Sequence, residues 1–320
     1  MNRLPVATTT AESAPTTTLR GDDSLLRRDG PERIPPPPLR WPPKVEVMGV
    51  GVSRTDYAEA AETIVAAGRR RLSAVVSCHP VAGVVAAARD TELRRRVNSF
   101  EMITPDGQPV RWAMNWLRSA GLSERVYGPQ LMLEVCRRAA ACDVGVYLYG
   151  ATPEVIERLR AHLAAQFPEL KICGAESPPF RPLSPEEDAA VVERFNQSGA
   201  GIIFLGLGCP KQDHFAYEHR ARVRAVQICV GAAFDFHAGT KPMAPRWMQR
   251  SGLEWLFRLW CEPRRLWRRY LGANSYFALR LAAEWFRCRI LRRQPSELES
   301  AYGDERAVFS ASLRSDDNGR

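Results

Sequence analysis

The sequence predicts an α/β fold, in which a mainly parallel, Rossmann-like sheet carries helices on both faces and is followed by a helical appendage. Two observations support this prediction. From Lys44 to about residue 245, short apolar runs alternate with helix-compatible segments, which is the pattern of repeated strand–helix units. From Trp247 the pattern becomes helical only, with tryptophan and arginine interleaved as far as Arg293. A chain of 320 residues can form one large domain, or one domain with appendages.

The first part of the predicted core contains three strands and two helices. Val45–Val50 is a β-branched apolar run typical of a strand, and Thr55–Ala67 has the apolar spacing of an amphipathic helix. Leu72–Ser77 predicts the second strand. Val81–Asn98 predicts a single helix, and Met102–Ile103 a short strand.

The alternation then continues through the middle of the chain. Pro129–Cys142 predicts a helix and Val144–Tyr149 an apolar strand. The next helix, Thr152–Gln166, begins with a threonine and a proline, which suit the N-cap and the first helical position. Leu170–Cys173 predicts a strand, and Pro185–Asn196 a helix.

Two later strands carry the strongest indication of a ligand. The apolar run Ile202–Leu205 is followed by Gly206 and Gly208, and then by Lys211 at the start of a helix-compatible segment. A strand that ends in glycines before a helix brings backbone N–H groups and a positive dipole end toward one point, which suits a phosphate. The apolar run Val226–Phe236 repeats this layout. It is broken by Gly231 and places Asp235 near the end of a neighbouring strand.

Four segments are expected along the chain. Residues 1–43, which include a run of four prolines, predict a disordered leader. Residues 44–245 form the core and residues 246–293 the Arg/Trp-rich appendage. Residues 294–320 are polar and predict a disordered tail.

The formal net charge of +9 makes phosphates, anionic lipid or nucleic acid plausible partners. No helix-turn-helix, zinc-finger or RNA-binding signature is present, so nucleic acid is not expected. The chain contains no apolar run near the ~20 residues that span a bilayer, and it begins without the order of a signal peptide. We therefore expect a cytoplasmic protein whose membrane contact is peripheral.

The cysteines indicate neither zinc nor disulfides. The eight of them are scattered without a C-x-x-C pair, and most lie in apolar contexts that suit reduced structural thiols. Gly49 and Gly51 resemble the start of a dinucleotide fingerprint, but a third glycine and an acidic residue after the second strand are missing. We expect neither a metal nor a nicotinamide cofactor.

Candidate reactive groups follow two of the predicted strands. Asp106 lies in the sequence Thr-Pro-Asp-Gly, where it can serve as a general base or simply as a turn residue. Ser77 and His79 end another strand, and a lone histidine is usually a hydrogen-bonded structural group. A nucleophilic Cys78–His79 pair is disfavoured because adjacent side chains on an extended strand point to opposite faces.

The appendage contributes three candidate arginines, Arg258, Arg265 and Arg268. Their spacing of seven and three would place them on one face of a continuous helix. There they can bind a diphosphate, lie on anionic headgroups beside tryptophans, or form a simple solvated face. Pro263 predicts a new helix after a break, which weakens the shared face.

Together these motifs resemble the WecG/TagA/CpsF family of bacterial glycosyltransferases, which includes N-acetylmannosaminyltransferases of teichoic acid synthesis. The resemblance runs from Val45 to about Leu271. It rests on several motifs in the same order, namely Thr104–Gly107, Arg125–Gly128, Gly206–Gln212, Gly231–Phe236, Ala244–Arg250, Gly252–Trp255 and Glu262–Arg265.

The resemblance implies an inverting, metal-independent transfer of a sugar from a UDP donor to a polyprenyl-diphosphate-linked acceptor on the cytosolic membrane face. By resemblance Asp106 is the catalytic base and no cofactor is used. The implied substrate-binding residues are Ser77, His79, Gly107, Gly128, Gln130, Gly150, Gly206, Gly208, Lys211, Gln212, Asp235, Arg258, Arg265 and Arg268.

The chain departs from the family pattern near the expected donor pocket. It has Ser77-Cys78-His79 where Thr-x-Asn is common, Gln130 where an acidic residue is frequent, Cys209 for Ser or Ala, and Asp213 for Glu. The identity of the sugar therefore stays open, as does self-association into a homo-oligomer. A rival function is a non-catalytic scaffold of polysaccharide assembly that binds anionic membranes through the Arg/Trp appendage.

Overall fold

The structure is a computed structural model that describes residues 39–289. The predicted disordered tail lies outside the described residues, as do most of the predicted leader and the last residues of the predicted appendage. The described chain begins just before the predicted core, and Leu39 and Trp41 pack against buried residues of that core.

The core is built on a six-stranded sheet in the order β4-β3-β8-β7-β5-β6, and every neighbouring pair is parallel. The prediction of a mainly parallel sheet is confirmed. All six strands therefore have their carboxyl ends at one edge, where ligands of such sheets bind. The strands are β3 (Ala74–His79), β4 (Met102–Pro105), β5 (Val146–Gly150), β6 (Ile172–Glu176), β7 (Ile202–Gly206) and β8 (Val226–Cys229).

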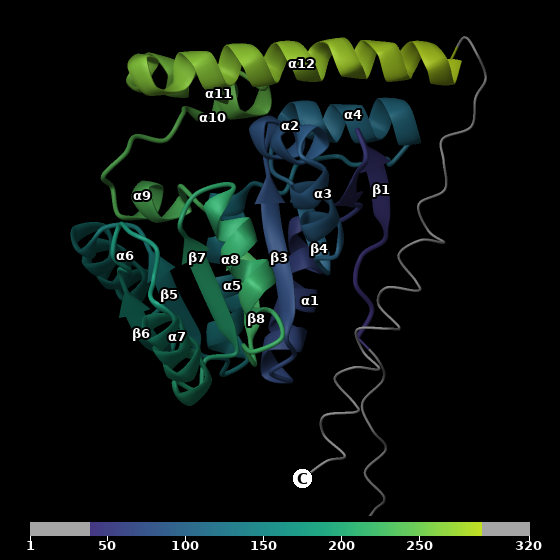
Figure 1. Cartoon of the computed structure of the whole chain (residues 1–320). Coiled ribbons are helices and arrows are strands. Elements are labelled where there is room, and N and C mark those ends of the chain that lie inside the picture. Colours follow the sequence, from purple (N-terminus) through teal and green to yellow (C-terminus); the bar gives the residue numbers. More distant parts are fainter. Residues whose placement is uncertain (1–38, 290–320) are drawn as a thin grey trace, which may run out of the picture. The chain divides into compact units, whose positions relative to one another are not determined.

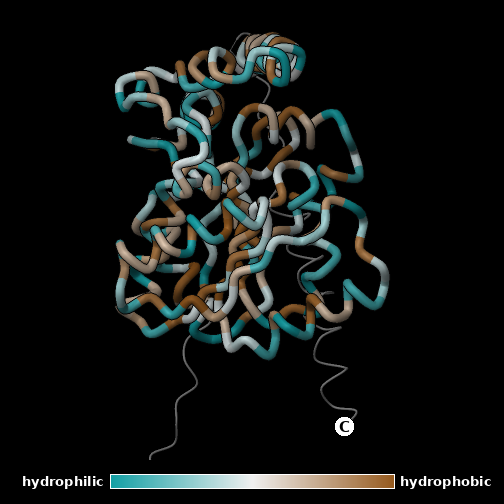
Figure 2. Tube along the Cα trace, turned by 90° about the vertical axis from the view of Figure 1, so that its left-hand side faces the viewer, coloured by the Kyte–Doolittle hydropathy of each residue, from teal (hydrophilic) through white to brown (hydrophobic). Residues whose placement is uncertain are grey.

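Helices cover both faces of this sheet, as predicted (Figure 1). One buried apolar cluster joins the sheet to α1, α5, α6 and α9, and a second joins it to α2, α3, α4, α7 and α8. Hydrophobic segments accordingly run through the middle of the core (Figure 2). The helices are α1 (Tyr57–Arg69), α2 (Val81–Arg89), α3 (Thr91–Asn98), α4 (Gln108–Arg118), α5 (Gly128–Ala141), α6 (Pro153–Gln166), α7 (Pro185–Gln197), α8 (Lys211–His219) and α9 (Ala233–His237).

The prediction of one strand at Val45–Val50 was wrong. The segment forms an antiparallel hairpin of β1 (Lys44–Val47) and β2 (Val50–Ser53) instead. Met48 and Gly49 make the turn with φ of 56° and 81°, the left-handed conformation that two-residue hairpin turns require at both central positions. Methionine rarely adopts this conformation, so the turn has little signal in the sequence.

Three further segments differ from the prediction. The predicted helix Val81–Asn98 is two helices, because Asp90 is extended and caps α3 through the backbone N–H groups of Glu92 and Leu93. Helix α4 was not predicted, although a proline in its first turn is a helix-start signal. The apolar run after Val226 leaves the sheet at Cys229 and continues as α9.

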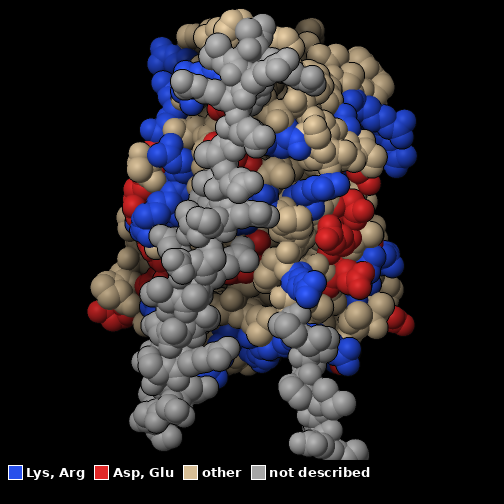
Figure 3. Space-filling model, turned by 90° about the vertical axis from the view of Figure 1, so that its right-hand side faces the viewer, with Lys and Arg blue, Asp and Glu red and all other residues tan. Residues whose placement is uncertain are grey.

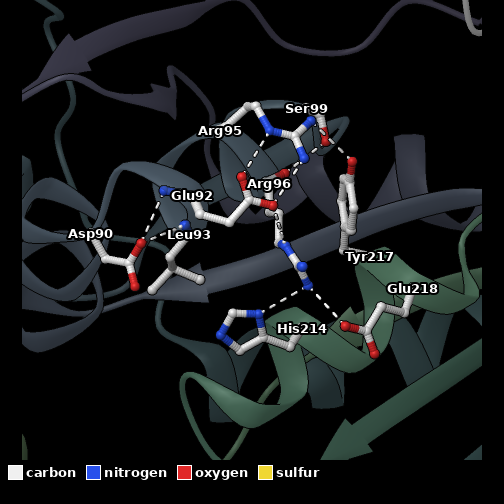
Figure 4. Close-up of polar contacts among 9 residues, drawn as sticks. All are labelled: Asp90, Glu92, Leu93, Arg95, Arg96, Ser99, His214, Tyr217 and Glu218. Atoms are coloured by element: carbon white, nitrogen blue, oxygen red, sulfur yellow. Dashed lines mark hydrogen bonds and ion pairs between the residues drawn. The ribbon is translucent and has the colours of Figure 1, made fainter.

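A polar network fixes α8 against α3 (Figure 4). Arg96 contacts Glu92 on its own helix and Glu218 on α8, in both cases at 2.9 Å. Its guanidinium also lies 5.0 Å from the ring centre of Tyr217. These contacts are mostly exposed and each stabilises the fold only modestly. They add to the buried packing of α8, which begins at Lys211 and contributes Ala216 to the core.

The appendage consists of α10 (Arg246–Arg250), α11 (Glu254–Cys261) and α12 (Pro263–Arg289). The predicted break before Pro263 is confirmed. These helices lie over the end of the sheet toward which the strands point (Figure 1), and α12 is anchored by the buried residues Leu266, Ala273 and Phe277. Within residues 39–289, no helix is both long enough and apolar enough to cross a membrane.

Surface charges are mixed on the face shown in Figure 3, where basic side chains lie among acidic ones. The net positive charge therefore does not produce a surface of one sign on that face. On α6, the exposed Arg160 pairs with Glu157 one helical turn away, at 2.7 Å.

Candidate active site

The carboxyl edge of the sheet brings together most of the predicted site residues. Gly150 and Gly206 lie side by side at the ends of β5 and β7. A Cβ atom on Gly150 would lie 2.6 Å from the backbone carbon of Gly206, and one on Gly206 would lie 2.5 Å from the ring of Phe234. Close packing alone therefore explains both glycines. Their contact with a ligand stays a prediction.

Asp106 follows β4 and faces the start of α5. Its Oδ1 accepts a hydrogen bond of 2.8 Å from the backbone N–H of Gly128, the first residue of α5. Its own backbone N–H donates to the carbonyl of His79 at 3.3 Å. Among residues 39–289, only Oδ1 of this carboxylate accepts a hydrogen bond from the protein. The side chain is half-buried and fixed in place, as a general base requires.

Charges of both signs surround Asp106. Burial raises its pKa to about 6, while Arg125, the Gly128 hydrogen bond and Arg258 act to lower the pKa and Glu254 acts to raise it. A carboxylate with a pKa near 6 is ionised at neutral pH and remains a stronger base than an ordinary aspartate. The predicted base thus has a suitable environment.

Arg125 links this site to the appendage. Its Nη2 lies 2.6 Å from Oε2 of Glu254, the first residue of α11, and both side chains are buried. The guanidinium also lies 4.2 Å from the ring centre of Tyr127. The ion pair therefore joins the segment before α5 to the appendage directly beside Asp106.

Ser77, His79 and Asp213 form a second buried cluster at the end of β3. Oδ1 of Asp213 accepts a 2.6 Å hydrogen bond from Ser77 Oγ and lies 3.3 Å from His79 Nε2. Because an ionised carboxylate only accepts, Nε2 of His79 carries a proton in this contact. Burial opposes ionisation of Asp213, but its interactions with His79, Ser77 and Cys209 hold its pKa below the usual value. This cluster joins the carboxyl end of β3 to the first turn of α8.

Three residues of the predicted nucleotide side lie in the loop before α8 or in its first turn, namely Gly208, Lys211 and Gln212. Gly208 has a φ of 81° and faces open space, so the loop conformation requires glycine. Lys211 is exposed at the first position of α8, and Gln212 is buried with its Oε1 near Gly231. Gln130 is exposed in the first turn of α5.

Asp235 does not lie at a strand end, because the strand stops at Cys229 and Asp235 belongs to α9. Its carboxylate forms an ion pair of 3.3 Å with Lys241, and Lys241 lies 4.0 Å from Glu262. Arg265 is exposed and pairs with Glu262 as well. Both Asp235 and Arg265 therefore already have partners of opposite charge.

The other two appendage arginines point to different places. Arg258 lies 5.6 Å from the ring centre of Phe236 and contributes to the field at Asp106. Arg268 lines a groove that also contains Cys209 and Pro210. The break before Pro263 separates the helix of Arg258 from that of Arg265 and Arg268, so the face expected of one continuous helix does not form.

Arg125, Glu254 and Asp213 are not among the site residues predicted from the sequence. Arg125 and Glu254 lie within two of the sequence motifs, and Asp213 is noted there only as a departure from the expected glutamate. Their importance arises from contacts between segments far apart in the chain. In the described part of the chain, no group of three or more His, Cys, Asp or Glu residues is arranged to hold a metal ion.

Two comparisons with known proteins bear on this site. Residues 45–290 match the model of the glycosyl transferase WecG/TagA/CpsF family. The chain is also similar to the N-acetylglucosaminyldiphosphoundecaprenol N-acetyl-beta-D-mannosaminyltransferase of Bacillus subtilis (strain 168). The two are 29% identical over 208 residues, which cover 65% of this chain and 78% of that protein.

Proposed function

Since the chain belongs to the WecG/TagA/CpsF family of glycosyl transferases, we propose that it moves N-acetylmannosamine or a related sugar from a UDP-sugar to a polyprenyl-diphosphate-linked glycan. Family membership makes it a glycosyltransferase and not a non-catalytic scaffold. The name of the Bacillus relative contains both a mannosaminyl group and a diphosphoundecaprenol acceptor, which supports this choice of donor sugar and acceptor lipid.

The observation that carries the proposal is the environment of Asp106. It lies at the carboxyl edge of a parallel sheet, is held by the Gly128 N–H, and has a pKa raised to about 6 by burial. In the proposed reaction Asp106 takes the proton from the acceptor hydroxyl. The hydroxyl oxygen forms a bond to the anomeric carbon as the bond from that carbon to the UDP oxygen breaks. A single displacement of this kind inverts the anomeric configuration.

Negative charge develops on the departing diphosphate, so positive charge placed there lowers the barrier most. Lys211 at the start of α8 and Arg258 near Asp106 are the groups we assign to this role. In the proposal these side chains and backbone N–H groups supply the charge that a divalent ion supplies in other transferases. Transfer should therefore persist in a chelator such as EDTA.

The proposed location is the inner membrane surface. Large aromatic side chains are exposed along the appendage, including Trp247, Trp260 and Trp267, and arginines lie between them in the sequence. Aromatic and basic side chains together suit the boundary between lipid headgroups and acyl chains. A peripheral enzyme placed this way meets a lipid-linked acceptor without spanning the bilayer.

Thermal unfolding with a panel of UDP-sugars tests the proposal, with UDP and NAD as comparators and without added metal. A ligand that binds only the folded state raises the melting temperature by mass action. Selective stabilisation by UDP compounds is expected and ranks the donors. Stabilisation by NAD, or equal stabilisation by every nucleotide, would contradict the proposed donor class.

A further inference from the structure

A groove of about 440 Å³ lies between α2 and α12. Ala82, Val85 and Ala86 of α2 form one wall, and Gly272 and Ala273 of α12 form the other. Ala82 lies in the first turn of α2, while the groove residue Arg89 is its last residue. At 1.5 Å per residue, the groove follows α2 for about 10 Å.

One end of the groove adjoins the candidate active site. A Cβ atom on Gly107, the neighbour of Asp106, would lie 3.7 Å from the backbone of Pro80 and Val81, where α2 begins. Cys209 and Pro210 of the predicted nucleotide loop also line the groove. A molecule in the groove can therefore extend one end toward Asp106.

Two arginines, Arg89 and Arg268, line the groove. Within residues 39–289, neither Arg89 nor Arg268 forms an ion pair, whereas Arg125 and Arg265 are each paired with a glutamate. Arg89 lies 5.1 Å from the ring centre of Tyr276, and Arg268 lies 5.1 Å from that of Trp267. Their charges remain available to an anion.

Gly272 keeps the groove open on the α12 side. It lies inside a long helix, where glycine is a poorer helix former than alanine, and a Cβ atom there would meet nothing within 4 Å. Tyr276 and Leu279 lie four and seven residues further along α12 and so share its face with Gly272. The side chain of Leu279 is 73% exposed, which extends the apolar surface beyond the groove.

The walls of the groove are formed by small apolar residues over about 10 Å, and Arg89 and Arg268 add positive charge. This combination suits a ligand that has an anionic head and a hydrocarbon tail. A sugar nucleotide is polar throughout and would leave the apolar walls unused. We propose that the groove between α2 and α12 binds the diphosphate and the first isoprene units of the polyprenyl-diphosphate acceptor. This inference rests on the proposed function and adds the place where the lipid enters.

Calorimetric titration of the full chain with farnesyl diphosphate tests the inference, with inorganic diphosphate as comparator. The wild-type protein should bind farnesyl diphosphate at least about tenfold more tightly than diphosphate, because only the former uses the apolar walls. Gly272→Leu fills the groove and should weaken farnesyl diphosphate at least about tenfold while leaving diphosphate unchanged. Arg268→Gln should weaken both ligands.

Two matched variants control for effects on α12 itself. Gly272→Ala adds only a Cβ atom and should bind as the wild type does. Ala278→Leu adds bulk to another, exposed face of the same helix and should also bind normally. Circular dichroism and UDP binding of each variant report whether it is folded.

Wild-type farnesyl diphosphate binding by folded Gly272→Leu would overturn the inference, and so would equal affinity of the wild-type protein for farnesyl diphosphate and diphosphate. If Gly272→Leu instead changed only the sedimentation of the protein, the groove would be a contact between copies and the inference would fall. UDP-sugar binding and transfer are measured separately. If the protein binds farnesyl diphosphate as expected but neither binds UDP-sugars nor transfers sugar, the result would count against the proposed function and not against the lipid groove.

Discussion

Arg125 and Glu254 form a buried ion pair of 2.6 Å that joins the segment before α5 to the first residue of α11 in the appendage. The pair lies within the electrostatic reach of Asp106, whose pKa responds to both charges in opposite directions. We therefore expect the pKa of Asp106 to depend on the contact between α11 and the core. Residues of the core and of the appendage thus both contribute to the surroundings of Asp106.

The opposite signs of these two charges give the first prediction. Glu254→Gln removes a negative charge that raises the pKa of Asp106, so the lower midpoint of the pH profile of kcat/KM should fall. Arg125→Gln removes a positive charge and should shift that midpoint upward. Each variant breaks a buried pair and should lose up to about 3–5 kcal/mol of stability in denaturant unfolding. Midpoints that move in the same direction would contradict the coupling.

The raised pKa of Asp106 also predicts a pH-dependent stability. The folded-state pKa of about 6 lies above the model value of 3.8, so the folded state binds the proton more tightly than the unfolded state. Stability from this group is fully present below about pH 4 and is lost as the pH rises through about 6. Asp106→Asn should therefore be more stable than the wild type at pH 8, by about 1–3 kcal/mol, and about equal at pH 4. Chemical denaturation at both pH values measures this, and equal stability at pH 8 would contradict it.

The Ser77–Asp213 hydrogen bond should be visible as a coupling energy. Both side chains are buried and their oxygens lie 2.6 Å apart. In a double-mutant cycle of Ser77→Ala and Asp213→Asn, we expect a coupling of about 1–3 kcal/mol, because the bond has an ionised acceptor. Urea unfolding of the four proteins gives the value. Additive effects would mean that the two residues act independently.

Membrane binding should depend on the appendage aromatics and not on exposed aromatics in general. Trp260 of α11 and Phe180 of the core are both 86% exposed, which makes them a matched pair. Trp260→Ala should reduce sedimentation with anionic liposomes several-fold, whereas Phe180→Ala should leave it unchanged. Equal losses would place the membrane contact elsewhere, as would unchanged binding after deletion from Trp255 onward.

The alternation of apolar runs and helices was sufficient to predict the parallel sheet, because such runs depend on local composition. The hairpin turn at Met48 was not predictable in this way, because its left-handed methionine is set by the pairing of β1 with β2. Asp235 was misplaced because an apolar run alone does not show where a strand ends and a helix begins.

The candidate site was predictable in part for a related reason. Asp106 and Lys211 lie beside turn and glycine signals that are visible locally. The contact of Ser77 with Asp213 spans 136 residues and that of Arg125 with Glu254 spans 129. Contacts of this range depend on strand order and on the docking of α11, which composition does not encode.

The rate of sugar transfer by the Asp106→Asn variant tests most directly whether Asp106 is the catalytic base. The assay uses UDP-N-acetylmannosamine and a lipid-diphosphate-linked N-acetylglucosamine acceptor in EDTA, and is run from pH 5 to pH 9. The wild-type rate should rise through about pH 6, as expected for a base with the pKa of Asp106. Asp106→Asn should lose about 10²–10⁴-fold in kcat while still binding UDP. Full activity in a folded Asp106→Asn protein would contradict the assignment of the base and the mechanism built on it.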